Sequence, residues 1–215
     1  MIRYALFDVD DTLYPRSAGV LPAIEGRIER YLVERLGLAP VEAASLRDAY
    51  AARHGTTLAG LLAHRQTDAE EYLAYVHDVH VEQLLQPDAE LDRALQALPW
   101  EPVIFTNSDR RHAERVVAAL GVRGRFTRIF DITATGYRHK PNPAVYEHVL
   151  AALGVPGSAC LFADDSLRNL RAAKAWHMTT VWVGPSAVPT DGIDYAIARA
   201  AAIGEVAAQV RLRES

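Results

Sequence analysis

The chain contains very little cysteine: Cys160 is the only one among 215 residues. A single cysteine cannot form an intramolecular disulfide, and the sequence has no CxxC or Cys/His pattern typical of a structural zinc site. The fold must therefore be stabilised by a hydrophobic core, for which a chain of this length is large enough. We expect a protein of a reducing compartment, the cytoplasm.

Long apolar runs and an excess of positive charge are also absent. No stretch approaches the roughly 20 apolar residues that a membrane span requires. The apolar start of the chain is short and soon reaches acidic residues, unlike a signal peptide. With 23 Lys and Arg against 27 Asp and Glu, the formal net charge is −4, which argues against non-specific binding to nucleic acid. We expect a small-molecule partner, no nucleic-acid polymer and no membrane, and a monomer or a homodimer.

Short apolar runs alternate with segments of helical spacing along most of the chain. The runs predict strands over 2–9, 103–105, 129–132, 159–163, 179–183 and 195–197. Between them, helices are expected over 109–120 and 142–153, because each begins at a capping residue and is followed by glycine. This alternation predicts an α/β fold: a Rossmann-like three-layer core with a parallel sheet.

One region breaks the alternation. From residue 22 to residue 98, apolar residues such as Ile24, Ile28 and Tyr31 recur at helical spacing, and no comparable strand signal occurs. We predict an inserted all-helical cap domain over 17–98, and a core domain formed by 1–16 and 99–215.

Polar residues directly follow the predicted strands or begin the next helix. Ligands of parallel α/β sheets bind beyond the carboxyl ends of the strands, so these residues are the candidates for chemistry. The candidates are Asp8, Asp10, Thr106, Asn107, Lys140, Asp164, Asp165 and Asn169.

The residue types in this set favour one kind of reaction. Several carboxylates suit Mg²⁺ better than zinc, because Mg²⁺ prefers hard oxygen ligands. A threonine hydroxyl, a lysine and free backbone N–H groups suit a phosphoryl group. An aspartate close to both can attack phosphorus and form an aspartyl-phosphate. The residues thus predict metal-assisted phosphoryl transfer through a covalent intermediate.

The same residues resemble the haloacid dehalogenase (HAD) superfamily of phosphohydrolases. Four elements occur in the order of that family, and the resemblance spans residues 7–183. The elements are Asp8-Val9-Asp10-Asp11-Thr12, Thr106, Lys140 and Asp164-Asp165. The helical insert is similar to the C1-type cap of the family, which closes over the active site and selects the substrate. The second acid of the first motif, Asp10, is absent from the dehalogenase branch and therefore favours a phosphatase.

The resemblance implies a role for each residue. Asp8 would be the nucleophile, and Asp10 the general acid and then the base that activates water. Thr106, the N–H of Asn107 and Lys140 would hold the phosphoryl oxygens. The Mg²⁺ site would comprise Asp8, the backbone carbonyl of Asp10, Asp165 as a direct ligand, and Asp164, with Asn169 acting through water.

A narrower resemblance bears on the substrate. Leu13 and Tyr14 after the first motif, and Asp164-Asp165-Ser166, are similar to the pyrimidine 5′-nucleotidase branch, although that branch typically has Asn at the position of Asp11. The alternatives are a phosphatase of sugar phosphates or phosphoglycolate, and a phosphomutase on the same scaffold. A non-catalytic binding module is disfavoured because Asp8 and Asp10 are both intact.

Two further features have ordinary structural explanations. His77 and His80 form an HxxH pattern in the predicted cap, but two ligands are too few for a metal site, and we interpret both as surface or partly buried histidines. Tyr14 would either stack on a nucleobase or fill the hinge of the cap, and we favour the hinge.

Overall fold

The computed structural model of the protein describes residues 1–188 and 190–214. Its centre is a six-stranded sheet of order β3-β2-β1-β4-β5-β6, in which every pair of neighbours is parallel. The strands are β1 (Tyr4–Phe7), β2 (Glu101–Phe105), β3 (Arg128–Phe130), β4 (Cys160–Asp164), β5 (Thr179–Val183) and β6 (Tyr195–Ile197). The predicted α/β fold with a parallel sheet is confirmed.

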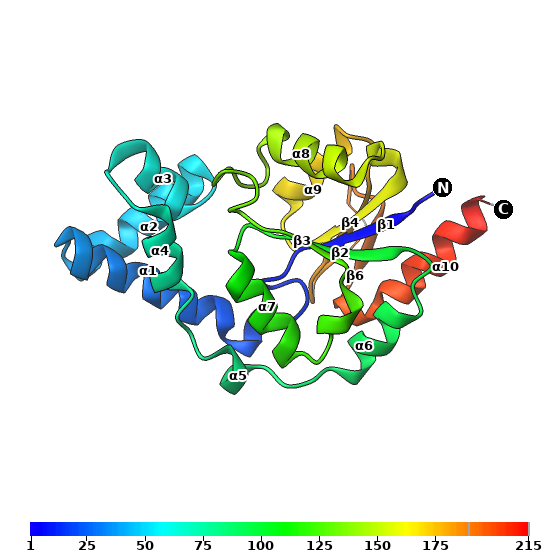
Figure 1. The fold of residues 1–215 in the computed structure, drawn as a ribbon, viewed down its shortest axis with the longest axis horizontal. Coiled ribbons are helices and arrows are strands. Elements are labelled where there is room, and N and C mark those ends of the chain that lie inside the picture. Colours follow the sequence, from blue (N-terminus) through cyan, green and yellow to red (C-terminus); the bar gives the residue numbers. More distant parts are fainter. Residues whose placement is uncertain (189, 215) are drawn as a thin grey trace.

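Helices cover both faces of the sheet (Figure 1). One face packs against α8 (Pro143–Leu153) and α9 (Leu167–Lys174), and the other against α7 (Arg110–Ala119) and α10 (Ile203–Glu214). Alternate residues of a strand serve the two faces: Phe162 belongs to the core beneath α8 and α9, whereas Leu161 and Ala163 belong to the opposite core. Because both faces are covered, the central strands are largely apolar, and Asp164 stands at the end of β4.

The caps of the core helices follow from the sequence. Asp109 accepts a hydrogen bond from the backbone N–H of His112 at 2.8 Å and begins α7. The Asn142 side chain does the same for Ala144 at 3.0 Å, and α8 ends at Gly154, which has a φ of 67°. These boundaries lie where the capping residues and glycines predicted them.

Six helices and a short 3₁₀ turn connect β1 to β2. They are η1 (Arg16–Ala18), α1 (Val20–Leu36), α2 (Pro40–His54), α3 (Thr57–His64), α4 (Ala69–Val76), α5 (Val81–Leu84) and α6 (Ala89–Gln96). Helices α1 to α4 form a bundle beside the core, while α6 packs on the 3₁₀ turn η4 (Ala200–Ala202) and on α10 of the core (Figure 1). The helical character of the insert is thus observed, and the division of the chain at residues 17 and 98 stays a prediction.

The strand order places the site. The chain builds β2 and β3 on one side of β1, then crosses to build β4, β5 and β6 on the other. The carboxyl ends of β1 and β4 therefore meet at the switch point of a doubly wound sheet, where ligands bind. The α1–α4 bundle lies beyond this edge of the sheet (Figure 1).

Across residues 1–188 and 190–214, no helix has both the length and the apolar character needed to cross a bilayer.

The central strands carry the core, so truncation there will lower stability strongly. Leu161 of β4 is fully buried, and we expect Leu161→Ala to lower the free energy of unfolding by about 2–5 kcal/mol. The matched control is Val41→Ala, since the Val41 side chain is exposed (79%) and its truncation should cost no more than about 0.5 kcal/mol. Urea unfolding measures both, and equal losses would contradict this description of the core.

Candidate active site

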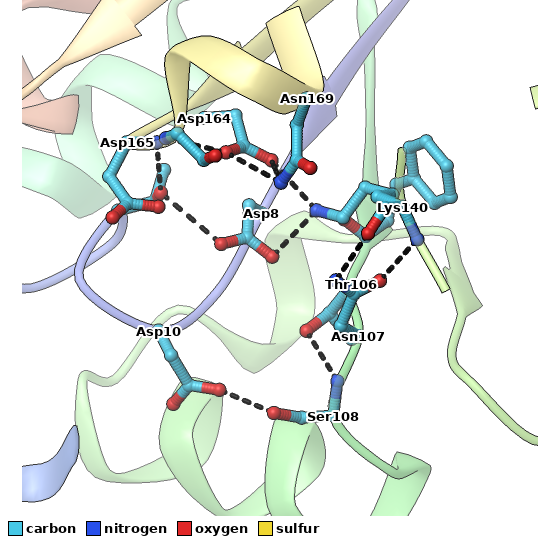
Figure 2. A network of polar contacts seen from close by, with 12 residues as sticks. Asp8, Asp10, Thr106, Asn107, Ser108, Lys140, Asp164, Asp165 and Asn169 are labelled. Carbon is cyan, nitrogen blue, oxygen red and sulfur yellow. Dashed lines mark hydrogen bonds and ion pairs between the residues drawn. The ribbon is translucent and has the colours of Figure 1, made fainter. Parts of the chain in front are cut away.

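The eight residues predicted from the sequence come together at the carboxyl ends of the strands (Figure 2). A cavity of about 390 Å³ opens there, with Lys140 and Asn169 in its wall. The other predicted residues that line it are Asp8, Asp10, Thr106, Asn107 and Asp165. Asp164 lies behind this wall and is completely buried.

A buried lysine connects the elements of the site. The Lys140 ammonium donates hydrogen bonds to Asp8 Oδ1 at 2.8 Å, to Asp164 Oδ2 at 2.8 Å and to the carbonyl oxygen of Phe105 at 2.7 Å. Its nitrogen also lies 5.0 Å from the ring centroids of both Phe105 and Phe162. All three N–H groups of the ammonium are engaged, so Lys140 fixes the orientation of the predicted nucleophile.

The charges of this trio depend on one another. Burial would lower the pKa of Lys140, but the negative charges of Asp164 and Asp8 outweigh it and raise the pKa, so the ammonium stays charged. Burial raises the pKa of Asp8 above its usual range, and the charge of Lys140 opposes this only in part. A divalent cation bound nearby would lower the pKa of Asp8 again.

The two residues after β2 support the lysine and line the cavity. The Asn107 side chain accepts a hydrogen bond from the backbone N–H of Lys140 at 2.8 Å and donates one to its carbonyl at 3.2 Å. Thr106 is buried (3% exposed), and its hydroxyl oxygen accepts from the backbone N–H of Ser108 at 3.1 Å. Asn107 therefore positions Lys140 with its side chain, and the residue also lines the cavity.

The adjacent aspartates at the end of β4 have different surroundings. Asp164 accepts hydrogen bonds from Lys140, from the Ser166 backbone N–H at 2.8 Å and from Asn169 Nδ2 at 3.1 Å. Among the described residues, no donor reaches the carboxylate of Asp165, although its backbone N–H donates to Thr12 Oγ1 at 3.0 Å. Burial and the charge of Asp8 raise the pKa of Asp165. Asp165 thus holds the carboxylate that is free for a new partner.

The acidic cluster has the composition of a site for a hard cation. One ligand atom from each of Asp8, Asp164 and Asp165 lies within 4.8 Å of the others. Three carboxylates this close repel one another, and the single charge of Lys140 does not neutralise them all. An additional cation with oxygen ligands, such as Mg²⁺, fits this donor set.

Asp10 is held by three donors from different parts of the chain. Tyr14 donates its hydroxyl proton to Asp10 Oδ1, Ser108 donates to Oδ2, and His112 Nε2 lies 2.7 Å from Oδ1. Burial would raise the pKa of Asp10, but His112, Ser108 and Tyr14 together hold it well below its usual range. These contacts favour the carboxylate form of Asp10.

The sequence did not point to Ser108 or His112 as site residues, and for Tyr14 it favoured the hinge. Tyr14 is buried (3% exposed), in keeping with the hinge, and its hydroxyl also serves Asp10. His112 stands three residues after the helix cap Asp109, so the helical turn directs it back toward the strand ends. A hydroxyl and an imidazole just after the second motif were the only signals, and neither residue type by itself indicates a site residue.

The helical insert contributes little to the cavity wall. Leu21 and Gly55 are the residues of the insert that line it among those the structure describes. Gly55 lies against His139, the neighbour of Lys140: a Cβ at this position would be 2.4 Å from the His139 ring, and the φ of 90° already favours glycine. The turn between α2 and α3 therefore touches the core directly beside the site.

The carboxylate pair around Lys140 leads to a pH-dependent prediction. Lys140→Met leaves Asp8 and Asp164 buried without their counter-charge, and we expect it to cost about 3–5 kcal/mol at neutral pH without metal. Burial already raises the pKa of Asp8 in the folded state, and without the opposing charge of Lys140 this pKa would rise further. The folded state then binds more protons than the unfolded state, so the cost grows as the pH rises. Urea unfolding in EDTA should give a larger loss at pH 8 than at pH 5.

The matched control for that experiment is Lys174→Met. Lys174 pairs with Asp194 at 2.9 Å on the surface, where both side chains are about a third exposed. Its loss should cost less than about 1 kcal/mol at either pH. A similar cost for both variants would show that the buried ion pairs do not hold the site together.

Comparison with known proteins shows the family. A family model described as haloacid dehalogenase-like hydrolase matches residues 2–177. "Phosphate metabolism protein 8" of Saccharomyces cerevisiae is 28% identical over 190 residues, which cover 80% of this chain and 58% of that protein, so the chain spans little more than half of this relative's length. A "Phosphoglycolate phosphatase" of Neisseria gonorrhoeae is 25% identical over 187 residues, 81% of this chain and 76% of that one.

A solved structure shares the whole architecture. The HAD-hydrolase YfnB of Bacillus subtilis, in a form bound to magnesium, superposes with a TM-score of 0.63 at 19% identity, over 96% of this chain and 98% of that one. At this identity the likeness concerns the fold. Together with the family model, it confirms what the four motifs predicted: the chain belongs to the haloacid dehalogenase-like hydrolase family and is an enzyme of the hydrolase class.

Proposed function

We propose that the protein is a Mg²⁺-dependent phosphatase that hydrolyses small phosphate monoesters through an aspartyl-phosphate on Asp8. The observation that carries this proposal is the position of the Asp8 carboxylate. It lies between the Lys140 ammonium and the free carboxylate of Asp165, and it faces a cavity that Asp10 also lines. A nucleophile, an acid–base group and a cation site thus meet at one place.

The donor set supports Mg²⁺. Asp8 and Asp165 would bind the ion with their carboxylates, the backbone carbonyl of Asp10 would complete the protein ligands, and Asp164 and Asn169 would act behind them. When bound, the ion would supply Lewis-acid polarisation of the phosphoryl oxygens. The related fold of YfnB was solved with magnesium, which is consistent with this assignment.

The first half of the reaction uses Asp8 and Asp10. An Asp8 carboxylate oxygen attacks phosphorus, and the bond between phosphorus and the leaving oxygen breaks. Asp10, in its protonated form, gives its proton to that oxygen, because an alkoxide is a poor leaving group. Thr106 and Asn107 line the cavity, and the Thr106 hydroxyl and the backbone N–H of Asn107 would hold the phosphoryl oxygens.

The second half reverses the role of Asp10. Water attacks the phosphorus of the aspartyl-phosphate, its proton passes to the Asp10 carboxylate, and the bond between phosphorus and Asp8 breaks. This step needs Asp10 as a carboxylate, which is the form that its three donors favour. Inorganic phosphate leaves, Asp8 is restored, and Asp10 is protonated for the next cycle.

The cavity wall favours small anionic esters. No aromatic side chain lines it among the described residues, and its only cation besides Lys140 is Arg168. Arg168 is exposed and has no ion-pair partner in the described part of the chain, so its guanidinium is available to a second anionic group of a substrate. One relative carries the name phosphoglycolate phosphatase, and phosphoglycolate has such a group.

Pyrimidine nucleotides are the second candidate. The Leu13-Tyr14 pair and the Asp164-Asp165-Ser166 run, which resemble the nucleotidase branch, speak for them. Against them, the Tyr14 ring is buried and its hydroxyl is bound to Asp10, so Tyr14 is not available to stack on a base. We propose that the helical insert acts as a cap, and a base would have to be recognised there.

The nucleophile gives the most direct test. We expect Asp8→Asn to reduce Mg²⁺-dependent phosphate release to background, because the amide cannot form the acyl-phosphate. The near-identical shape of Asn should leave the fold intact, as circular dichroism would verify. Asp48→Asn on the surface is the matched control and should keep full activity. Turnover by Asp8→Asn at the wild-type rate would refute the assignment of the nucleophile.

Metal removal tests the cation site independently. We expect EDTA to abolish phosphate release and added Mg²⁺ to restore it. We also expect Asp165→Asn to raise the Mg²⁺ concentration needed for half-maximal activity, since Asp165 holds the carboxylate without a protein donor. Undiminished activity of the wild-type enzyme in EDTA would exclude the proposed metal dependence.

A substrate panel distinguishes the candidates. The panel comprises phosphoglycolate, sugar phosphates, UMP, CMP, dTMP, AMP and GMP. We expect kcat/KM to be highest for small esters with a second anionic group, and to fall for these in Arg168→Ala. A preference for UMP, CMP or dTMP would instead support the nucleotidase. Transfer of phosphate to a second hydroxyl of the substrate without release would indicate a phosphomutase.

A further inference from the structure

His112 lies in the second layer of the site and is rigidly held. Its side chain is completely buried on the first turn of α7, and its Nε2 is 2.7 Å from Asp10 Oδ1. Both carboxylate oxygens of Asp10 already accept hydrogen bonds, from Tyr14 and from Ser108, so the hydrogen of this third bond is assigned to His112 Nε2. The other ring nitrogen, Nδ1, is buried without a hydrogen-bond partner among the described residues.

An unpartnered buried nitrogen in a folded protein calls for an explanation, since it carries a desolvation cost of about 1–3 kcal/mol. An apolar side chain of similar size would pack in this position as well as the imidazole does. What an apolar side chain lacks is the Nε2–H group aimed at Asp10. The geometry therefore indicates that the contact with Asp10 is what the histidine contributes.

His112 is held from three directions. Its backbone N–H donates to Asp109 Oδ1 at 2.8 Å, its ring edge meets Asp10, and one ring face stacks on His77 with centroids 4.5 Å apart and planes 20° apart. His77 follows α4 of the helical insert and is itself bound through Nδ1 to Asp109 Oδ2 at 2.6 Å. Asp109 thus binds both histidines, His77 of the insert through its ring and His112 of the core through its backbone N–H.

The other donors to Asp10 do not fix its carboxylate in the same way. Tyr14 and Ser108 present hydroxyl groups, whose hydrogens rotate and which can also accept a hydrogen bond. The imidazole N–H has one direction, set by a ring that packing holds in place. Of the three, His112 is the donor that fixes where Asp10 Oδ1 lies.

We propose that His112 is a positioning residue for Asp10: its Nε2–H holds the carboxylate in the place from which Asp10 exchanges a proton with the leaving oxygen. The His77 ring stacks on the His112 ring and keeps it in place. The position of Asp10 therefore depends on how the insert packs against α7. The proposal rests on the proposed function, in which Asp10 is the acid and base.

The test compares two leaving groups. In His112→Leu we expect kcat/KM for an alkyl phosphate to fall about 10- to 100-fold, as for a misplaced catalytic group, with KM nearly unchanged. For p-nitrophenyl phosphate, whose leaving group needs little proton donation, the fall should be much smaller. Because kcat/KM covers only the steps up to departure of the leaving group, later hydrolysis of the phosphoenzyme does not obscure the comparison.

Two further variants separate positioning from a general structural role. His112→Gln places an amide N–H at a similar reach and should recover most of the activity on the alkyl ester. His148→Leu, an exposed histidine on α8, is the matched control and should change neither substrate. In an Asp10→Asn background, His112→Leu should have no further effect, because the two residues act as one unit. Equal losses on both substrates, or no rescue by His112→Gln, would overturn the proposal.

A structural readout keeps this test separate from the proposed function. Crystal structures of the wild type and of His112→Leu should show the Asp10 carboxylate displaced in the variant. An unmoved carboxylate would overturn the positioning role even in a protein without phosphatase activity. Conversely, a displaced carboxylate in a wild type that releases no phosphate from any ester would leave the positioning geometry intact and would refute the proposed function alone.

Discussion

The structure of the site depends on the burial of one ammonium group between two carboxylates. Lys140 reaches from the loop before α8 to Asp8 after β1 and Asp164 at the end of β4, and it is shielded from water by the rings of Phe105 and Phe162. Removing three charges from water is costly, and the attraction among them offsets this only while their geometry is kept. The Asn107 side chain hydrogen-bonds to both the N–H and the carbonyl of Lys140. The backbone at Lys140 is therefore as important for the site as the carboxylates.

The acids of the site differ from one another in their surroundings. The carboxylate of Asp164 accepts hydrogen bonds from Lys140 and Asn169 and stabilises the charge of the lysine. Among the residues that the structure describes, no donor reaches the carboxylate of Asp165. Asp10 stands apart from both, on the opposite side of Asp8, with donors of its own (Figure 2). The same residue type thus occurs as a buried anion paired with Lys140, as a carboxylate without a protein donor, and as a carboxylate held by three donors, and the environment makes the difference.

Much of this was accessible from the sequence, and the reasons are physical. Apolar runs identify strands that are buried on both faces, and in a parallel sheet the residues after such strands must meet at one edge; hence Asp8, Thr106 and Asp165 could be assigned to one site. The contacts of His112 and Ser108 with Asp10 could not, because they depend on how the segment after β2 lies against the loop after β1. The packing of α6 on the core, rather than on the insert, was likewise not visible in its helical periodicity.

The alternation of β4 has a consequence for how such a site can vary during evolution. Residues of β4 serve the two faces of the sheet in turn, and pairing with β1, in which Phe7 lies beside Ala163, fixes which of the two aspartates turns inward. A slip of one residue would exchange the anion under Lys140 with the one that faces the cavity. Loops around this edge can change in length and sequence. The register of the five-residue strand β4 cannot change, because a shift would remove the carboxylate that balances the charge of Lys140.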